Sequence, residues 1–414
     1  MKKIIVIGGG ISGLCSAYYL IKEGYEVTVL DKKDITSGVS FINAGFIIPS
    51  HFISLAAPGM ITKGLKWMFN SASPFYVKPR LDYEFIAWAL NFKKSATLAK
   101  VEKAIPVLMD INLKSRGLYE DMLSSMDFPF HYEQKGLLMA YQSVKSGEEE
   151  LKVAERAVKE GLEAEQLNRD QLRNIQPAFS DKVIGAVHYK CDSHTTPGQF
   201  MLNLKSWLKE KGVVFELNQE VKKFVYDSNK IIAVETQNGS FQADEFVLTS
   251  GSWTSSLAKS LGLKIPIQGG KGYSMDIYRP NEITIPSVLV EAKVAVTPMK
   301  GFTRFAGTME FSGNNSDIKR KRVEALANSV AEYYDGVTLN SEEKEGAVSG
   351  LRPVSPDGLP FLGRTSVFKN LTVASGHAMM GWSLGPITGK LVAEIISEKQ
   401  TSVKLDPFRI DRFA

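Results

Sequence analysis

The residues with the clearest chemical meaning lie near the N-terminus, where Gly8, Gly10 and Gly13 have Gly-x-Gly-x-x-Gly spacing. Glycines at these positions permit a tight turn and close backbone approach, and the helix that follows presents its N-terminus to a pyrophosphate. Asp31 ends the next apolar run, where a carboxylate is positioned for a ribose 2′-hydroxyl. These residues predict a dinucleotide-binding site.

The segments around the glycines have the pattern of a strand–helix–strand unit. The β-branched run 3–7 predicts a strand in the middle of a parallel sheet. Residues 14–23 predict a helix that Gly24 ends, and residues 25–30 predict a second strand. The motif therefore has the structural context that its chemistry requires.

The motif alone does not separate NAD from FAD, and Lys32 and Lys33 leave room for a 2′-phosphate. A second glycine cluster, 269–272, has no helical pattern after it, so it does not predict a second nucleotide turn. A flavoenzyme that reduces its flavin with NADPH would need two such sites. The protein therefore uses either NAD(P) alone or FAD with an electron partner other than NAD(P).

The composition is that of an ordinary globular protein. The chain has 414 residues, of which 44% are hydrophobic and 23% charged, with a net charge of +5. This length favours two or three domains at ~150 residues each. The densest basic group, 319–322, is predicted to be the solvated face of a helix, so no nucleic-acid partner is expected.

The cysteines and histidines do not predict a metal centre. Cys15 and Cys191 are too few for a disulfide framework or a zinc site, which suits a reducing compartment. No metal is expected, because four further histidines have no partner spacing for one: His51, His131, His188 and His194.

No segment predicts export or a membrane span, since the apolar run after the N-terminus stops at Gly8. The stretch 35–62 has no charged residue but contains Pro49 and Pro58, and is predicted to be a buried, irregular segment that lines a site. The expected location is cytoplasmic. The amphipathic segment 61–69 leaves open peripheral contact with the inner face of the cell membrane.

The rest of the chain alternates helical and extended patterns. Helices are predicted at 81–100, 105–122, 148–159, 199–211, 318–334 and 386–397. Strands are predicted at 136–141, 213–217, 221–226, 231–236, 246–248, 273–278, 294–298, 302–306 and 371–374. Helix-and-strand blocks that flank a strand-rich block favour an α/β plus α+β fold with two domains interleaved in sequence.

Several motifs resemble the D-amino-acid oxidase superfamily of flavoproteins. Residues 40–45 match its Ser-x-x-Asn-Ala-Gly segment, residues 350–353 its Gly-(Leu/Phe)-Arg-Pro signature, and residues 376–382 the stretch before its last helix. The resemblance implies a Rossmann-like, glutathione-reductase-like FAD-binding domain interleaved with a substrate domain built on a mixed β-sheet with helices. Its boundaries would be 1–50, 150–180, 198–262 and 345–414 for the FAD-binding domain, and 51–149, 181–197 and 263–344 for the substrate domain.

Within the superfamily, the chain looks most like the small-subunit type of D-amino-acid dehydrogenase, through residues 56–59, 66–69, 271–274 and 307–310. It departs at Phe46, where those enzymes tend to have glutamine, and at residues 191–197. Both departures are expected near the substrate, so the resemblance leaves the substrate open.

The resemblance implies FAD bound without a covalent link. Relatives of sarcosine oxidase attach flavin to a cysteine in the C-terminal third, whereas the last cysteine here is Cys191. A helix that begins near Pro386 would direct its positive end toward the flavin N1–C2=O region. The implied FAD contacts are Gly8, Gly10, Ile11, Ser12, Gly13, Asp31, Lys32, Ser40, Asn43, Ala44, Gly45, Val221, Gly251, Gly381, Trp382, Ser383 and Leu384.

The resemblance also implies amine oxidation, with hydride transfer from the substrate α-carbon to flavin N5 and no catalytic side chain. Arg352 matches the family's carboxylate-binding arginine, although the sequence alone favours a structural pair with Asp357 or Glu345. Tyr273 could add a hydroxyl to the same carboxylate or belong to the core. His377 is expected near the flavin ring.

The favoured function is FAD-dependent oxidative deamination of a D-amino acid, or of a cyclic D-imino acid such as a D-proline derivative. Electrons would pass to a quinone or another carrier. The alternatives are an oxygen-using amine oxidase of the glycine or sarcosine oxidase type, a flavin-binding subunit that needs a partner in a larger complex, and a non-flavin NAD dehydrogenase. Flavin absorbance, and its loss on adding substrate to the isolated protein, would separate them.

Overall fold

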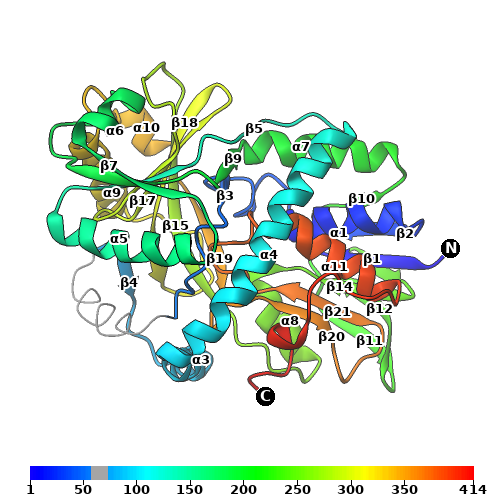
Figure 1. The fold of residues 1–414 in the computed structure, drawn as a ribbon. Helices are drawn as coiled ribbons and strands as arrows, with labels where there is room; N and C mark the ends of the chain where they lie inside the picture. Colours follow the sequence, from blue (N-terminus) through cyan, green and yellow to red (C-terminus); the bar gives the residue numbers. More distant parts are fainter. Residues whose placement is uncertain (57–72) are drawn as a thin grey trace.

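The computed structural model describes residues 1–56 and 73–414, and its main sheets lie in two halves joined by helices (Figure 1). Pro58 and the predicted amphipathic segment 61–69 lie outside the described residues. Within them, no helix is long and apolar enough to cross a membrane. The described part of the predicted irregular stretch is buried from residue 46 to residue 50.

The first sheet lies on the right of Figure 1 and is parallel apart from its last strand. Its apolar strands are buried because both faces are covered. One face packs against α1 (Ile11–Lys22) and α11 (Gly385–Ile396), and the other against α8 (Thr254–Ser260) and a separate sheet of β11 (Lys223–Asp227), β12 (Lys230–Thr236) and β13 (Gly239–Gln242). In order across the sheet, the strands are β10 (Val214–Glu216), β2 (Glu26–Leu30), β1 (Lys3–Ile7), β14 (Glu245–Leu248), β21 (Leu371–Ser375) and β20 (Phe361–Arg364).

Glycines bring α1 and α11 into close contact. A Cβ on Gly385 would lie 2.5 Å from Ile11 Cγ1, and one on Gly389 would lie 2.3 Å from the Cys15 carbonyl oxygen. The two helices begin at these contacting residues, Ile11 and Gly385. Their positive N-terminal ends therefore meet at one place.

The large sheet forms the other half and mixes parallel and antiparallel pairs. The predicted glycine cluster 269–272 lies inside the strand β15 (Gln268–Ile277), which confirms that it is not a nucleotide turn. Two strands, β7 and β19, pair in this sheet although the predicted domain division assigns them to the FAD-binding segments. The strand order is β19 (Val348–Val354), β15 (Gln268–Ile277), β18 (Phe302–Phe311), β17 (Val294–Met299), β16 (Ser287–Leu289), β6 (Leu137–Tyr141), β8 (Gly185–Tyr189) and β7 (Ala164–Asn168), with β4 (Phe75–Val77) beside β18.

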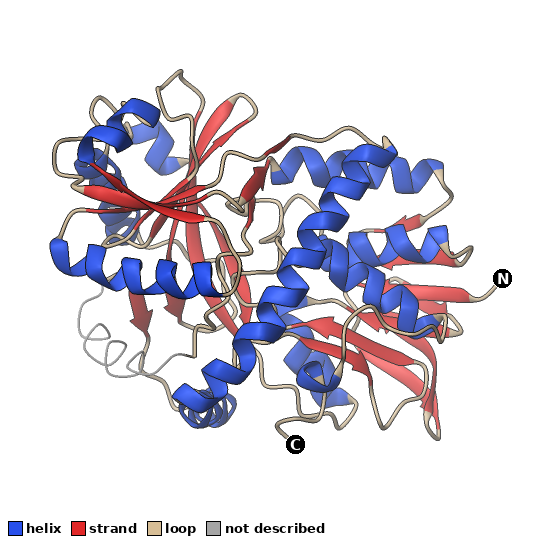
Figure 2. Ribbon diagram, viewed as in Figure 1, coloured by secondary structure: helices blue, strands red, loops and turns tan. Residues whose placement is uncertain are grey.

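Helices cover the large sheet and connect the halves (Figure 2). The sheet carries α5 (Val144–Lys159), α6 (Arg169–Ile175), α9 (Arg320–Tyr333) and α10 (Ser341–Glu345). The predicted helix 81–100 is divided into α3 (Tyr83–Ser95) and α4 (Leu98–Ser125), because Thr97 caps α4 by accepting a hydrogen bond from the Lys100 amide. Helix α4 runs diagonally across the front of both halves (Figure 1).

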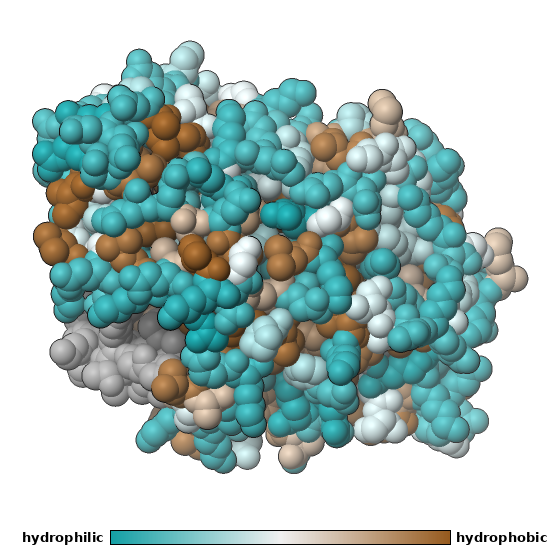
Figure 3. Space-filling view, in the orientation of Figure 1, coloured by the Kyte–Doolittle hydropathy of each residue, from teal (hydrophilic) through white to brown (hydrophobic). Residues whose placement is uncertain are grey.

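A short sheet lies between the two halves, near α7 (Pro197–Glu210). Its strands are β3 (Phe46–Ile47), β9 (Ser193–Thr195) and β5 (Tyr132–Glu133), with β9 in the centre. Two single-turn helices, Gly251–Trp253 and Asp406–Phe408, complete the described elements. On the face drawn in Figure 3, apolar side chains form separate small groups among polar ones.

Candidate functional site

The glycine turn between β1 and α1 has the geometry that the sequence predicts. Gly8 has a φ of 115°, and a Cβ on Gly13 would lie 1.9 Å from the Gly8 carbonyl oxygen. The Asp31 carboxylate accepts hydrogen bonds from the amides of Gly9, at 2.7 Å, and Lys33, at 2.9 Å. Burial raises the pKa of Asp31, although both amides act in the opposite direction. The carboxylate thus joins the glycine turn to the end of β2.

The N-terminus of α1 is open to an anion. Its first residue, Ile11, donates its amide to Ser40 Oγ at 3.1 Å, so the predicted segment 40–45 lies against the turn. The cap residue Gly10 has no side chain, and the amides of Ser12 and Gly13 receive no side-chain cap. Helix α11 likewise begins without a side-chain cap on Leu384. Two adjacent helix ends of this kind favour negatively charged groups.

Further residues flank Asp31 on the side expected for adenine. The amide of Gln219 donates to the Asp31 carbonyl at 2.8 Å, which brings the chain leading to the buried Val221 beside the end of β2. The Lys32 ammonium lies 3.1 Å from the centre of the Trp253 ring, close to Gly251 in the sequence. Sequence reasoning missed Trp253, since no motif marks it.

The segment predicted to contact flavin is held to the turn before α11. Asn43 Oδ1 accepts from the Gly45 amide at 2.9 Å, and the Ala44 carbonyl accepts from the Thr297 hydroxyl at 2.7 Å. The Gly45 carbonyl accepts from the Thr195 amide, while Thr195 Oγ1 accepts from Trp382 Nε1 at 2.8 Å. Residues 43–45 and Trp382 therefore meet through β9.

Helix α4 fixes the backbone of the same turn. Tyr119 donates its hydroxyl to the Trp382 carbonyl at 2.7 Å, and Ser115 donates to the Ser383 carbonyl at 2.6 Å. The Ser383 hydroxyl donates to Asn112 Oδ1 at 2.9 Å. Sequence reasoning missed these three residues of α4. Their signal is polar side chains at helical spacing on one buried face.

Arg352 on β19 has no carboxylate partner within the described residues. Its guanidinium donates to the Thr308 carbonyl at 2.8 Å, while Asp357, which the sequence offers as a partner, pairs with Arg412. Burial lowers the pKa of Arg352 to about 10. A Cβ on Gly272 would lie 2.1 Å from Arg352 Nη1, so the guanidinium occupies the space that glycine leaves.

The face that carries Arg352 is turned toward the predicted flavin segment. Gly350 lies on that face, because alternate residues of a strand share one. A Cβ on Gly350 would lie 2.7 Å from Val39 Cγ2 and 3.1 Å from Ile42 Cδ1. Arg352 therefore lies on the side of the large sheet that meets residues 39–42.

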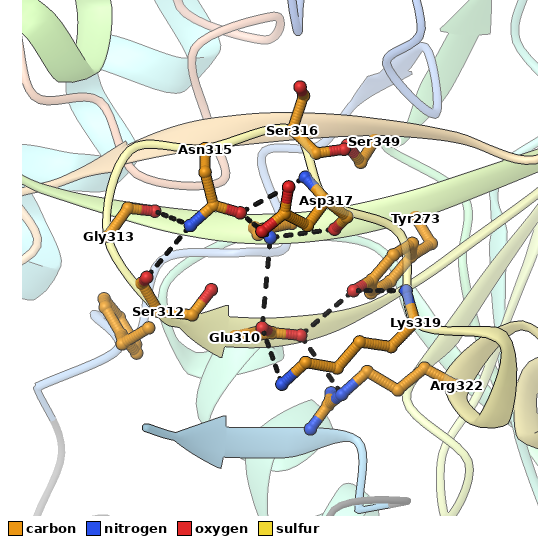
Figure 4. Close-up of polar contacts among 12 residues, drawn as sticks. Tyr273, Glu310, Ser312, Gly313, Asn315, Ser316, Asp317, Lys319, Arg322 and Ser349 are labelled. Carbon is orange, nitrogen blue, oxygen red and sulfur yellow. Dashed lines mark hydrogen bonds and ion pairs between the residues drawn. The ribbon is translucent and has the colours of Figure 1, made fainter. Parts of the chain in front are cut away.

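The structure does not bring Tyr273 to Arg352. Gly272 faces Arg352, so the neighbouring Tyr273 projects from the opposite face of β15. There its hydroxyl donates to Glu310 Oε2 at 3.0 Å (Figure 4). Glu310 also lies 3.2 Å from both Lys319 Nζ and Arg322 Nε. The prediction that 319–322 is a solvated helix face is wrong at Arg322, which is fully buried.

His377 is buried between the predicted turn and α11. Its Nε2 shares a hydrogen bond with Thr388 Oγ1 at 2.9 Å, and burial lowers the pKa of His377 to about 4. A Cβ on Gly381 would lie 3.5 Å from the His377 Cβ. The ring is therefore neutral at pH 7 and anchors residues 376–381 to α11.

Two of the histidines that have no partner spacing for a metal in the sequence lie close together in the structure. His131, Glu133 and His194 come together around β5 and β9, with one ligand atom of each within 4.8 Å of the others. The first two are two residues apart, but His194 is distant in sequence, and only the pairing of the strands brings it near.

The cysteines lie in different surroundings. Cys15 is buried in α1 against α11, and burial raises the pKa of its thiol far above the usual range. Cys191 is half-buried beside Asp192, and burial likewise raises its thiol pKa. Both thiols are therefore protonated at pH 7 and poorly nucleophilic.

Sequence comparison places the chain in one family along nearly its whole length. A family model described as FAD-dependent oxidoreductase (DAO) matches residues 3–395. The D-amino acid dehydrogenase of Vibrio atlanticus is 32% identical over 419 residues, covering 99% of this chain and 100% of that protein. That of Neisseria meningitidis serogroup C is also 32% identical, covering 99% of each chain.

Solved structures share the fold at lower identity. Glycine oxidase from Geobacillus kaustophilus matches with a TM-score of 0.79 at 20% identity, covering 100% of this chain and 99% of that one. L-proline dehydrogenase from P. horikoshii matches with a TM-score of 0.75 at 20% identity, covering 100% and 97%. The predicted fold class is confirmed. The two helix ends, whose N-cap residues give no side-chain cap, and the Asp31 turn suit FAD, the cofactor of this family. The chain belongs to the DAO family of FAD-dependent oxidoreductases.

Proposed function

We propose that the protein oxidatively deaminates a D-amino acid, or a cyclic D-imino acid such as a D-proline derivative. The observation that carries this proposal is Arg352, a half-buried guanidinium without a carboxylate partner among the described residues, on the face turned toward residues 39–42. A planar, permanently charged group of this kind suits the carboxylate of an amino acid. The full-length relatives named D-amino acid dehydrogenase support the D configuration.

FAD, when bound, would accept a hydride at flavin N5. The protein has to orient the substrate and stabilise charge. Among the described residues Arg352 gives one donor, to Thr308, and it would bind the substrate carboxylate with its other donors. The N-termini of α1 and α11 would stabilise the diphosphate and the negative charge of the reduced ring. Tyr119 and Ser115 fix the carbonyls of Trp382 and Ser383, and so orient the backbone before α11.

The FAD contacts proposed are those named from the sequence, with Trp253 added beside Lys32. Non-covalent binding is part of the proposal, since Cys15 is buried in a helix contact and both thiols are protonated at pH 7. Acid precipitation would then release all of the flavin into the supernatant. Flavin retained in the pellet would contradict this point.

The test of the substrate is anaerobic mixing of the FAD-loaded protein with the D and L forms of the same amino acids and of proline. We expect a D form to reduce the flavin, seen as loss of its visible absorbance, and the matching L form not to. Reduction by the isolated protein also argues against a need for a partner subunit. Equal rates with both enantiomers, or no reduction by any amino or imino acid, would contradict the proposal.

For the electron acceptor we propose a quinone or another carrier. The reduced protein is mixed with a soluble quinone or with air, and the return of flavin absorbance is followed. Fast reoxidation by the quinone and slow reoxidation by air are expected. Immediate reoxidation by air with release of peroxide would replace this proposal by an oxidase of the glycine or sarcosine type.

A further inference from the structure

A second set of side chains with clear chemical capacity lies in the short sheet. Glu133 of β5 and His194 of β9 are direct partners across an antiparallel pair, so their side chains share one face. His131 precedes β5. Its Nε2 lies 3.3 Å from Glu133 Oε1, and His194 Nε2 lies 3.6 Å from Glu133 Oε2.

His194 has an unusual environment for an imidazole. Its side chain is 0% exposed. Within the described residues neither ring nitrogen makes a hydrogen bond of regular geometry, and the Pro298 carbonyl offers the ring only a weak one. Buried polar atoms nearly always have a partner, because burying them without one is costly. The ring is directed at Glu133 and lies 5.4 Å from the His131 ring, centre to centre. An electron-pair acceptor placed between His131, Glu133 and His194 would give the His194 ring a partner.

His131 is held by its other nitrogen. Its Nδ1 lies 2.9 Å from Thr196 Oγ1, which also accepts the Lys300 amide at 3.0 Å. When Nδ1 donates its proton to Thr196, the lone pair of Nε2 faces Glu133. This is the arrangement in which histidine usually binds a metal, with the second ring nitrogen held by a hydrogen bond.

We propose that His131, Glu133 and His194 bind a divalent transition metal ion, with Zn²⁺ as the best match. Two imidazoles and one carboxylate are a ligand set that zinc prefers, and tetrahedral coordination at ~2.0–2.1 Å separates the ligand atoms by about 3.3 Å. Glu133 Oε1 lies 3.3 Å from His131 and Glu133 Oε2 lies 3.6 Å from His194, so each imidazole is near this separation from a different carboxylate oxygen. The three atoms lie within 4.8 Å of one another, so small rotations of the side chains complete the site.

The fourth coordination position has room for water or a small anion. A cavity of about 460 Å³ opens beside the cluster, and its lining includes His131, Glu133, Thr284 and Lys300. A site with three protein ligands and an open position is of the ligand-exchanging type. Because the backbone of His194 also pairs with Phe46 of β3, metal binding would stiffen the strand next to the predicted flavin segment.

Lys135 competes with the metal. Its ammonium lies 2.8 Å from Glu133 Oε2 and its side chain is 47% exposed, so it can move into solvent when a dication replaces it. Removing the Lys135 charge should therefore strengthen metal binding, whereas removing a ligand should weaken it. Opposite effects from neighbouring residues distinguish a built site from general attraction to a charged surface.

The test uses the full-length, FAD-loaded protein, stripped with a chelator and then freed of it. Zn²⁺ is titrated by calorimetry, and Co²⁺ by the visible absorption that tetrahedral coordination gives. We expect one ion per chain. The variants Glu133→Gln and His194→Gln should bind at least tenfold more weakly, and Lys135→Met severalfold more tightly. His188→Gln is the matched control. His188 is not one of the three proposed ligands, and its ring contacts Glu165 and the Lys135 carbonyl instead.

Bound flavin per chain and the circular dichroism spectrum verify that each variant is folded. Absence of stoichiometric binding in the parent protein would overturn the proposal. So would Zn²⁺ binding that is unchanged in both Glu133→Gln and His194→Gln, or that His188→Gln weakens as much as they do.

Discussion

Arg352 and Arg322 belong to opposite faces of the large sheet, and their surroundings differ in burial and in charge pairing. Arg322 is fully buried, with its Nε 3.2 Å from Glu310 and its guanidinium over the Tyr76 ring at 4.9 Å. Arg352 is half-buried and meets only a carbonyl, that of Thr308, with no carboxylate within reach among the described residues. One positive charge is neutralised within the fold, and the other is not.

The difference separates a structural arginine from one available to a ligand. Burying a charge is costly unless it is paired, so an arginine without a partner is a cost to the fold that a bound carboxylate removes. The Glu310 carboxylate lies within 4 Å of the side-chain nitrogens of Lys319 and Arg322 (Figure 4). It also lies within 4 Å of Lys271 Nζ. Substitutions in the Glu310 cluster should therefore affect stability, whereas substitution of Arg352 should affect substrate binding.

The largest effect is expected at Glu310. Burial raises its pKa, but the hydrogen bond from Tyr273 and the charge of Arg322 hold the pKa below its usual range. Glu310→Gln leaves Arg322 buried without a counter-charge and leaves Lys271 with Asp317 alone, and we expect unfolding to become easier by about 3–5 kcal/mol. Urea denaturation of the FAD-loaded protein measures this.

The control for Glu310 is an exposed ion pair. Lys399 pairs with Glu23, and their side chains are 54% and 32% exposed. Lys399→Gln should change the free energy of unfolding by less than about 1 kcal/mol. If Glu310→Gln cost no more than this control, the cluster would not be a structural charge pair.

Arg352→Met should have the opposite profile. We expect the Kd for the amino-acid substrate to rise roughly 100-fold, about 3 kcal/mol, because the carboxylate loses its partner. Stability should stay the same or increase, since a half-buried charge without a carboxylate partner among the described residues is removed. Arg412→Met is the comparison, because Arg412 pairs with Asp357. This variant should lower stability and leave flavin reduction unchanged. Unchanged substrate binding in Arg352→Met would remove this residue from the site.

Contiguous signals explain which features the sequence predicts well. The glycine turn, the following helix and Asp31 lie within 31 residues, and each requirement is local: a tight turn, a helix end, a carboxylate at a strand end. The Ser40 contact with α1 follows from a single motif. Most helices and strands also lie within a few residues of their predicted bounds.

Features that depend on strand pairing could not be predicted. Tyr273 and Gly272 are neighbours in sequence, and only the pairing of β15 with β19 decides which of them faces Arg352. Arg322 has the spacing of a solvated helix face, yet α9 turns it onto Glu310. The His194 cluster likewise exists only because β9 pairs with β5.

A smaller effect is expected at His377. It tests whether the buried His377 ring is uncharged in the folded protein. Burial lowers the pKa of His377 to about 4 from its usual 6.5, so the unfolded chain takes up the proton first as the pH falls. Stability is therefore complete above pH 6.5 and is lost on acidification, by about 2 kcal/mol at pH 5 for this residue. His377→Gln should flatten the dependence of the unfolding free energy on pH over this range. A variant with an unchanged pH dependence would show that the ring is not held neutral.

The smallest effect concerns the space under the guanidinium. Gly272→Ala places a Cβ 2.1 Å from Arg352 Nη1, and the end of a flexible side chain has to move aside. We expect about tenfold weaker substrate binding, about 1.4 kcal/mol, with little change in stability because the backbone is not strained. Gly117→Ala in α4, where a Cβ meets nothing within 4 Å, should leave substrate binding unchanged. Normal binding in Gly272→Ala would mean that the position of Arg352 is set from elsewhere, and that the glycine serves only the pairing of β15 with β19.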